Sequence, residues 1–268
     1  FADLRAYFSK KSIRYQQIID TAPMTTLTGT DANETMNGVV DRDNVMTSGA
    51  GNDTLNGSNR NDLLYGDDGD DEIHSGEGDD VLYGGTGNDR LYAEAGDDLL
   101  VGGTGNDYLR GGEGNDTYVF SKGDGLDTVV DSSGIDTIQF GEGISPDDIV
   151  AKVVQDSNYV NLELSIKGTD DKITVYQHFG YNYNSYEETP SYQVEKITFA
   201  DGTTWDTKTI HDKAHNMSGT EGSDTYRVSD QSATIFRGLG GNDTIVGGIA
   251  NDLLYGDDGD DEIHSGEG

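Results

Sequence analysis

Apolar side chains recur at every ninth position from Ser48 to Val119, and glycine and acidic residues fill much of the space between them. The stretch divides into eight nine-residue units, of which GGTGNDRLY and GGTGNDYLR are typical. The first six residues of a unit have turn-like composition, and the last three read as a short strand that buries one side chain. That side chain is the eighth of each unit: Leu55, Leu64, Ile73, Leu82, Leu91, Leu100, Leu109 and Tyr118.

Two units make one coil with a loop on each side and a short strand on each face. Stacked coils form parallel ladders about 4.8 Å apart, and the eighth-position side chains line up as a thin apolar seam. The pattern therefore predicts an all-β fold, with a parallel β-roll over residues 27–119. Degraded units at Gly29–Asn37 and Gly38–Met46 keep the length but lose glycines, which suits an N-terminal cap, and Thr47 is then a one-residue slip.

The segments flanking this array have different patterns. Residues 1–26 begin with apolar side chains at near-helical spacing among basic residues, which predicts a short N-terminal helix. Residues 120–216 alternate, which predicts a β-rich domain continuous with the roll, a long Tyr-rich loop over 179–192 and a short helix over 205–214. The strands expected from the end of the array onward are Thr117–Phe120, Asp127–Asp131, Asp136–Phe140, Ile149–Gln155, Val160–Ile166, Lys172–Val175 and Gln193–Phe199.

A longer repeat is superimposed on the nine-residue one. Residues 61–78 recur identically at 251–268. Residues 217–268 are therefore expected to form a second, truncated β-roll. We expect the chain to be an excerpt of a longer protein whose period is about 190 residues.

The composition excludes several classes of partner and of stabilising interaction. The formal net charge is −34, which argues against nucleic acid and anionic membrane surfaces as partners. Only 32% of the residues are hydrophobic and 38 are glycine, so a conventional apolar core is undersized. The chain has no cysteine, so disulfides do not stabilise it.

The sixth residue of every unit is aspartate, and stacking places each one directly below its equivalent in the next coil. Such rows of carboxylates repel one another unless a hard cation lies between them. Carboxylate and carbonyl oxygens favour Ca²⁺, which accepts six to eight flexible ligands, over Mg²⁺, which resists dehydration. The loops offer neither Cys nor His, which disfavours Zn²⁺.

The predicted calcium ligands are these carboxylates and the carbonyls exposed where glycine is the fourth residue of a unit. The aspartates are Asp53, Asp62, Asp71, Asp80, Asp89, Asp98, Asp107 and Asp116, joined in the second array by Asp243, Asp252 and Asp261. The glycines are Gly51, Gly69, Gly78, Gly87, Gly96, Gly105 and Gly114. Pairing between coils predicts about six Ca²⁺ ions in 48–119 and one or more in 238–268. Because residues 48–119 carry 17 acidic and 3 basic side chains, we expect the roll to fold only with calcium.

The units resemble those of the RTX (repeats-in-toxin) family, G-G-x-G-(N/D)-D-x-(L/I/F)-x. The resemblance is strong over 48–119, extends to 238–268 and is weak over 29–46. Segment Thr117–Ile149 is similar to the flank of haemolysin-type exoproteins, and Lys196–Trp205 to the end of their β domain. The resemblance implies a right-handed, calcium-filled parallel β-roll and export by a type I secretion apparatus. It also implies folding in external calcium and a secreted or cell-surface location.

Several units depart from the family pattern, and we expect weak or missing calcium at one or two of them. Arg60 replaces a loop glycine, Asp67–Asp68 crowd one loop, and Ala93–Glu94 replace Gly–Gly. In the second array, Leu239 replaces glycine and Ile249–Ala250 alter another unit. Asp243 and Asp261 complete one site there, whereas Asp252 has no partner within the chain.

No other catalytic or metal-binding motif is evident. EF-hand spacing and G-x-S-x-G are missing, and His211 and His215 lack a third zinc ligand; His74 and His264 are expected to face solvent. We therefore interpret the chain as a non-enzymatic calcium-binding module of a large secreted exoprotein of the cytotoxin or haemolysin type. The alternative is a repeat module of a cell-surface adhesin or S-layer-like protein, with ligand binding by 120–212. A hydrolase with such a tail requires a catalytic domain that these residues do not contain, and a membrane or host-cell target is left open.

Overall fold

The chain folds as a parallel β-solenoid of about 12 turns, which confirms the all-β roll that the repeats predict. The computed structural model describes residues 24–155, 159–179, 193–227 and 234–267. The predicted N-terminal helix and most of the predicted Tyr-rich loop lie outside these residues. Within the described ranges, no helix is long and apolar enough to cross a membrane.

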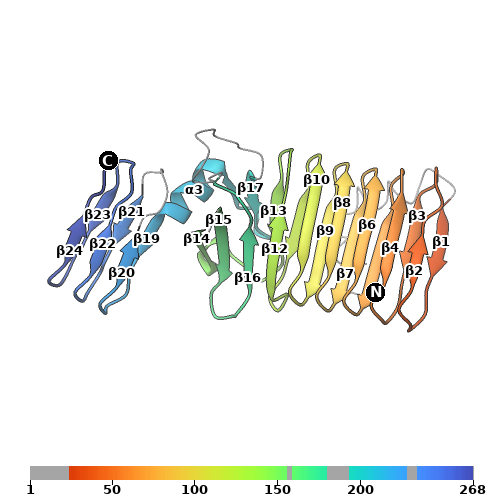
Figure 1. Ribbon diagram of the computed structural model, residues 1–268, viewed down its shortest axis with the longest axis horizontal. Coiled ribbons are helices and arrows are strands. Elements are labelled where there is room, and N and C mark those ends of the chain that lie inside the picture. The colour runs from red at the N-terminus through yellow and green to blue at the C-terminus, as the bar shows by residue number, and fades with distance from the viewer. Residues whose placement is uncertain (1–23, 156–158, 180–192, 228–233, 268) are drawn as a thin grey trace.

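Two nine-stranded sheets form the main roll, because successive units contribute strands alternately to one sheet and the other. In spatial order, the first sheet contains β1 (Thr25–Thr28), β3 (Asn44–Thr47), β5 (Leu63–Asp68), β7 (Val81–Thr86), β9 (Leu99–Thr104), β11 (Thr117–Phe120), β13 (Thr137–Phe140), β17 (Lys196–Thr198) and β18 (Thr204–Asp206). The second sheet contains β14 (Ile149–Gln155), β15 (Val160–Ile166), β16 (Lys172–Val175), β12 (Leu126–Val130), β10 (Tyr108–Glu113), β8 (Arg90–Ala95), β6 (Glu72–Glu77), β4 (Thr54–Ser58) and β2 (Thr35–Asn37). Figure 1 shows these strands stacked along the long axis of the molecule.

The parallel register brings the eighth-position side chains into a single column within each sheet. Leu64 pairs with Leu82 in the first sheet, and Ile73 lies between Leu55 and Leu91 in the second. All five side chains are 0% exposed and belong to one continuous core cluster between the sheets. The seam that the repeat predicts is therefore present, and it runs on into the flanking domain.

Burial in the first sheet extends beyond the eighth position. Leu63, Val81 and Tyr65, which alternate with the core side chains, are only 3%, 6% and 9% exposed and form a second apolar cluster. The repeat pattern predicts one buried side chain for each short strand, so this burial was not anticipated from the sequence.

The parallel ladder continues beyond Val119 into the flanking domain. β12 pairs with β10 and β13 with β11, and each of these coils holds two extra residues, because paired positions are 20 apart rather than 18. Strands β16 and β17 add another coil, and β14, β15 and β18 close the sheets by antiparallel pairing. A 3-10 turn, Pro146–Asp148, precedes β14. Strands β11, β14, β15 and β16 have the predicted bounds.

One helix, α3 (Thr207–His215), lies at the end of the flanking domain among the described residues. It begins two residues later than predicted, because Thr204–Asp206 pairs with β17 as a strand. Asp206 then caps the helix: its carboxylate accepts the Thr209 N–H at 2.8 Å. Ile210 and Ala214 are fully buried against the core cluster.

A second, smaller roll follows α3, as the second array predicts (Figure 1). Its two three-stranded parallel sheets contain β19 (Asn216–Ser218), β21 (Ile235–Arg237) and β23 (Leu253–Tyr255), and β20 (Thr225–Arg227), β22 (Thr244–Val246) and β24 (Glu262–His264). Phe236 and Ile245 are 3% and 0% exposed and mark its interior.

The degraded units predicted that Thr47 is the extra residue near the start of the roll, and this prediction is wrong. Met46 pairs with Leu64 and Thr47 with Tyr65, so both already occupy regular strand positions. The extra residue instead lies in the preceding turn, where Asp41 has a φ of 62°. A loop can absorb an insertion, whereas a shift within the strand would turn Met46 away from the core.

The core column predicts a large cost for removing one of its side chains. We expect Leu82→Ala, measured by urea unfolding in calcium, to lower the free energy of unfolding by roughly 2–5 kcal/mol. Leu126→Ala is the matched control because Leu126 is 49% exposed on a strand of the same roll. It should change the free energy of unfolding by about 0.5 kcal/mol or less. An equal decrease in the free energy of unfolding for the two variants would contradict the conclusion that the inner seam stabilises the roll.

Candidate metal centre

The sixth-position aspartates lie at the start of each strand, with their side chains inside the loops. All eight in the main roll are 0–3% exposed. From Asp71 onward, the Oδ1 atom of each accepts the backbone N–H of the equivalent aspartate one coil earlier: Asp62 N–H donates to Asp80 Oδ1 at 2.6 Å, and Asp80 N–H donates to Asp98 Oδ1 at 2.7 Å. The structure thus brings together every expected pair: 53/71, 62/80, 71/89, 80/98, 89/107 and 98/116.

The fourth-position glycines allow the loops to approach one another closely. Gly87 and Gly105 have φ values of 129° and 146°, which L side chains rarely adopt. A Cβ on Gly87 would collide with the carbonyl oxygen of Gly69 in the coil below. The loops therefore stack closely on one another. At the first-position glycines, the Asp89 Oδ2 atom and the Gly102 carbonyl oxygen both crowd the position that a Cβ on Gly84 would occupy, so carbonyl oxygens lie near the carboxylates.

The second carboxylate oxygens reveal an unmet requirement for a ligand. Oδ2 is buried and has no hydrogen-bond partner in the part of the chain that the structure describes for Asp53, Asp62, Asp71, Asp80, Asp89, Asp98 and Asp107, and for Asp243 in the second roll. Buried polar atoms are normally paired, because burial removes the water that would otherwise solvate them. A recurring orphan oxygen beside stacked carbonyls fits a hard, oxygen-seeking cation.

Burial raises the pKa of these carboxyl groups. The pKa of Asp80 rises to about 8, that of Asp89 to about 7 and that of Asp98 to about 9. Desolvation is the main cause, and neighbouring carboxylates add to it, while the hydrogen bond from the preceding coil opposes it. The folded loops therefore disfavour the bare negative charges that they contain.

The aspartate columns continue past the array through two residues that the sequence analysis did not select. Asp107 N–H donates to Asp127 Oδ1 at 2.9 Å, and Asp116 N–H donates to Asp136 Oδ1 at 2.8 Å. Asp127 and Asp136 are 3% and 1% exposed, and burial is the first cause that raises the pKa of each to about 8. A signal was present: GLDTV (125–129) and GIDTI (134–138) repeat the pattern of GNDTL (51–55).

Further acidic groups gather around the end of one column. Ligand oxygens of Asp116, Asp131 and Asp136 lie within 4.8 Å of one another. Asp131 Oδ2 accepts the Tyr118 hydroxyl at 2.6 Å, and Glu195 Oε2 accepts the Asp136 N–H at 2.7 Å. Glu195 thus takes the position in the flanking domain that an aspartate holds in each earlier coil. At the other end of the roll, Glu34 and Asn44 donate their N–H groups to Asp53 and Asp62 and begin the columns.

The second roll repeats the geometry over fewer coils. Asp224 N–H donates to Asp243 Oδ1 at 2.8 Å, and Asp243 N–H donates to Asp261 Oδ1 at 2.9 Å. The pair expected between Asp243 and Asp261 is therefore present. Asp252 aligns with Thr234, whose N–H donates to it at 2.9 Å, so the equivalent position one coil earlier holds a threonine instead of an aspartate.

Three of the irregular loops keep the backbone path of the regular ones, whereas Arg60 does not adopt the positive φ of the glycines that it replaces. Asp67, Glu94 and Leu239 have φ values of 66°, 76° and 76°, the same sign as the loop glycines at equivalent positions. His74 is half-buried rather than fully solvent-facing, since its ring pairs with Glu72 at 3.1 Å and stacks on Tyr92. His264 is exposed, as expected. His211 and His215 stack on α3 at 4.0 Å, and neither belongs to the three-residue acidic cluster found among the described residues.

These raised pKa values predict that the cation-free chain gains β structure in acid. A carboxyl group whose pKa is raised by folding stabilises the fold when protonated. Its contribution is full below its unfolded pKa of about 4 and is lost as the pH rises through the folded value. For Asp80, Asp89 and Asp98 the loss begins above about pH 4 and is complete by about pH 9. Circular dichroism of the chain in chelator should show more β signal near pH 5 than near pH 9, both approximate choices within this window; the opposite trend would contradict the assignment.

Comparison with known proteins agrees with this architecture. The family model for the RTX calcium-binding nonapeptide repeat (4 copies) matches residues 47–82, 83–118 and 237–268. The model for the haemolysin-type calcium binding protein related domain matches residues 161–209. A comparison with curated proteins found no match. The matched repeats coincide with the stacked aspartate loops of both rolls, and the chain is a member of the RTX family of haemolysin-type calcium-binding nonapeptide repeat proteins.

Proposed function

We propose that this chain is a calcium-dependent folding module of a large secreted exoprotein and has no catalytic role of its own. The observation that carries the proposal is the row of buried Oδ2 atoms that lack a hydrogen-bond partner among the described residues. Calcium would supply positive charge and vacant coordination positions at these oxygens. The protein's part is to hold carboxylates and carbonyls at fixed positions between successive coils.

The proposed ligands are the sixth-position carboxylates of adjacent coils and the loop carbonyls beside the fourth-position glycines. In the main roll these are the columns from Asp53 to Asp107 and from Asp62 to Asp116, with about six ions between the coils. In the second roll Asp243 and Asp261 form the complete pair, and Asp252 contributes to a site where Thr234 takes the place of an aspartate one coil earlier. The unit that contains Arg60 is one where we expect weak or missing calcium, because Arg60 places a cation at the fourth position instead of glycine.

Charge explains why folding would wait for calcium. Residues 48–119 have a net charge of −14, and stacking them closes the distance between like charges. Because the sites exist only between stacked coils, the free energy of calcium binding becomes free energy of folding. This coupling suits export of an unfolded chain by a type I secretion apparatus from a calcium-poor cytosol, followed by folding in extracellular calcium.

Two classes of parent protein suit such a module. A cytotoxin of the haemolysin type is the first proposal, on the basis of the family match to the repeats and to the related domain. A cell-surface adhesin or S-layer-like protein is the second. The identical sequences of residues 61–78 and 251–268 favour this proposal. They indicate tandem copies of a long repeat, and such copies would hold a ligand-binding domain at a distance from the cell surface.

We also propose that the calcium columns extend into the flanking domain through Asp127 and Asp136. Both accept the same inter-coil hydrogen bond as the array aspartates and are equally buried. Residues 27–216 would then fold as one calcium-dependent unit, and 217–268 as another.

Removal of calcium should unfold the chain. We expect excess chelator at neutral pH to abolish most of the β signal in circular dichroism and millimolar Ca²⁺ to restore it, whereas equimolar Mg²⁺ should not. The same β signal with chelator and with calcium would sink the proposal.

A single column aspartate should shift the calcium requirement. Asp80→Asn, which removes charge beside two neighbouring carboxylates, should raise the calcium concentration at the folding midpoint roughly twofold or more. Asp79→Asn is the matched control, because Asp79 is exposed and five other units already carry Asn at its position: Asn52, Asn61, Asn88, Asn106 and Asn115. Its midpoint should be unchanged. A similar shift in both variants would show that overall charge, rather than the buried column, sets the requirement.

The extension into the flanking domain predicts a change in the number of bound ions. Asp136→Asn should reduce calcium bound at saturation, measured by equilibrium dialysis, by about one ion per chain. Asp147→Asn, an exposed aspartate of the 3-10 turn in the same domain, should bind the wild-type number. Unchanged stoichiometry in Asp136→Asn would restrict the ions to the nonapeptide array.

A further inference from the structure

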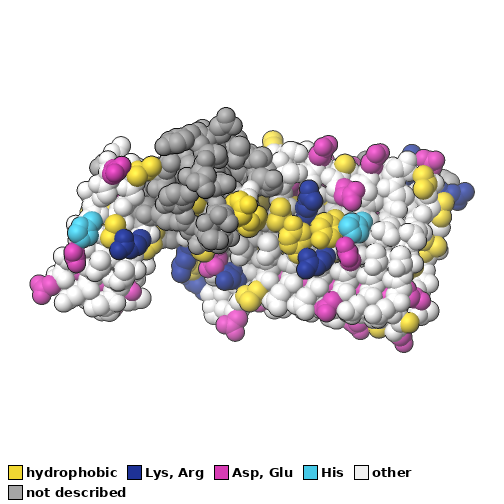
Figure 2. All heavy atoms as spheres, in the orientation of Figure 1, with side chains coloured by type: hydrophobic (Ala, Val, Ile, Leu, Met, Phe, Trp, Pro, Cys, Tyr) yellow, Lys and Arg dark blue, Asp and Glu magenta, His cyan; other side chains and the backbone are white. Residues whose placement is uncertain are grey.

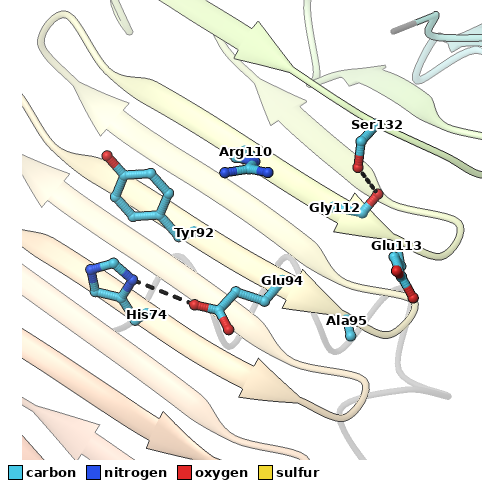
Figure 3. A pocket seen from close by; sticks show the side chains of 8 residues that line it. All are labelled: His74, Tyr92, Glu94, Ala95, Arg110, Gly112, Glu113 and Ser132. Carbon is cyan, nitrogen blue, oxygen red and sulfur yellow. Dashed lines mark hydrogen bonds and ion pairs between the residues drawn. The ribbon is translucent and has the colours of Figure 1, made fainter. Parts of the chain in front are cut away.

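A groove crosses the outer face of the second sheet, away from the aspartate columns. It has a volume of about 570 Å³, and the side chains that carry its chemistry are His74, Tyr92, Glu94, Arg110, Glu113 and Ser132. They come from β6, β8 and β10 and from the turn after β12. Figure 3 shows these side chains, with Tyr92 between His74 and Arg110.

Aromatic rings form a platform along this groove. The parallel register places His74 beside Tyr92 and Tyr92 beside Arg110 on adjacent strands. The His74 and Tyr92 rings stack with their centroids 4.7 Å apart and their planes 7° from parallel. The Tyr108 ring lies 5.7 Å from that of Tyr92 and is tilted by 48°. Both tyrosines remain half-buried, so part of the platform is open to a ligand.

Hydrogen-bond donors and acceptors both surround the platform. Arg110 and Arg90 are exposed on this face, and no ion pair or side-chain hydrogen bond links either of them to another described residue. By contrast, Arg60, the remaining basic residue of 48–119, lies 3.4 Å from Asp43. Glu94 contacts His74 at 3.6 Å and keeps an exposed carboxylate. In Figure 2, hydrophobic side chains gather with Lys or Arg and one His over the middle of the roll.

We propose that this groove binds a neutral, extended oligosaccharide. Flat aromatic faces would stack against the apolar faces of pyranose rings, while Arg110 donates to hydroxyl groups and Glu94 and Glu113 accept from them. Strands in a sheet lie about 4.8 Å apart, close to the length of one hexopyranose unit, so consecutive sugars could meet consecutive strands. A small apolar platform with a few fixed polar groups is typical of small-molecule sites.

Charge selects a neutral ligand over an anionic one. The net charge of −34 repels polyanions at long range, and two carboxylates, Glu94 and Glu113, line the groove itself. A folded protein partner would need about 800 Å² of surface on each side, whereas the groove spans only a few strands. An acidic peptide or an acidic glycan is therefore disfavoured and becomes an outcome of the test.

The groove depends on the proposed calcium-dependent folding, because its side chains come from separate coils that must stack. Folding and binding are nevertheless distinguishable. Circular dichroism on each sample reports whether the roll has formed, and only folded samples are used to judge binding. A chain that fails to fold in calcium contradicts the proposed function, whereas a folded chain that fails to bind contradicts only this inference.

The experiment is isothermal titration calorimetry of the full chain in millimolar Ca²⁺ with cellotetraose, a neutral and flat probe. We expect a dissociation constant of about 1 mM or lower. Tetragalacturonate and a tetraglutamate peptide serve as the anionic arms and should bind at least about tenfold more weakly. Tighter binding of either anionic probe, or no heat from cellotetraose with folded protein, overturns the proposal.

Variants locate the site. Tyr92→Ala and Arg110→Gln should each weaken cellotetraose binding about tenfold and leave the calcium-dependent dichroism signal unchanged. Arg60→Gln is the matched arginine control, since Arg60 is in a loop and outside the groove. It should bind like the parent chain. Cellotetraose binding that survives both groove substitutions would place the ligand elsewhere and overturn the assignment.

Discussion

Each coil of this protein places a buried carboxylate against the backbone of the coil before it, and the rest of the fold depends on that contact. One oxygen of each aspartate is held by an inter-coil N–H, for example between Asp71 N–H and Asp89 Oδ1 at 2.8 Å. In the seven array aspartates from Asp53 to Asp107, the other oxygen is buried and has no hydrogen-bond partner among the described residues. The contact that aligns the coils therefore also concentrates negative charge between them.

Burial of the apolar core by itself offsets little of the repulsion between these carboxylates. Each coil adds to the inner seam only two eighth-position side chains, such as Leu82 and Leu91, because glycine occupies so much of the unit. The same glycines are required, since a side chain at Gly87 would strike the loop below. The nine-residue unit thus accounts for the close loop packing, the thin core and the buried carboxylates. Together these features make a cation part of the folded structure.

The flanking domain shares this constraint instead of standing apart from it. Its strands extend both sheets, and Asp127, Asp136 and Glu195 continue the sequence of inter-coil acceptors after the nonapeptides end. The antiparallel strands β14 and β15 then finish the second sheet with a larger apolar surface, including Leu162 and Leu164. The nonapeptide section of the roll is therefore organised by its loops, whereas the flanking domain ends in a conventional apolar core.

The sequence by itself determined the repeating geometry. A fixed nine-residue period fixes which residues share a column, so the inner seam, the pairs from 53/71 to 98/116 and several strands of the flanking domain, such as Val160–Ile166, could be predicted. Only the tertiary structure decided what the period does not encode. Loops absorb insertions, so the extra residue lies near Asp41 and Asp127 joins its column across 20 residues instead of 18. Burial of Leu63 and the placement of Tyr92 beside Arg110 arise from packing between coils, and contacts between separate coils are invisible in any single unit.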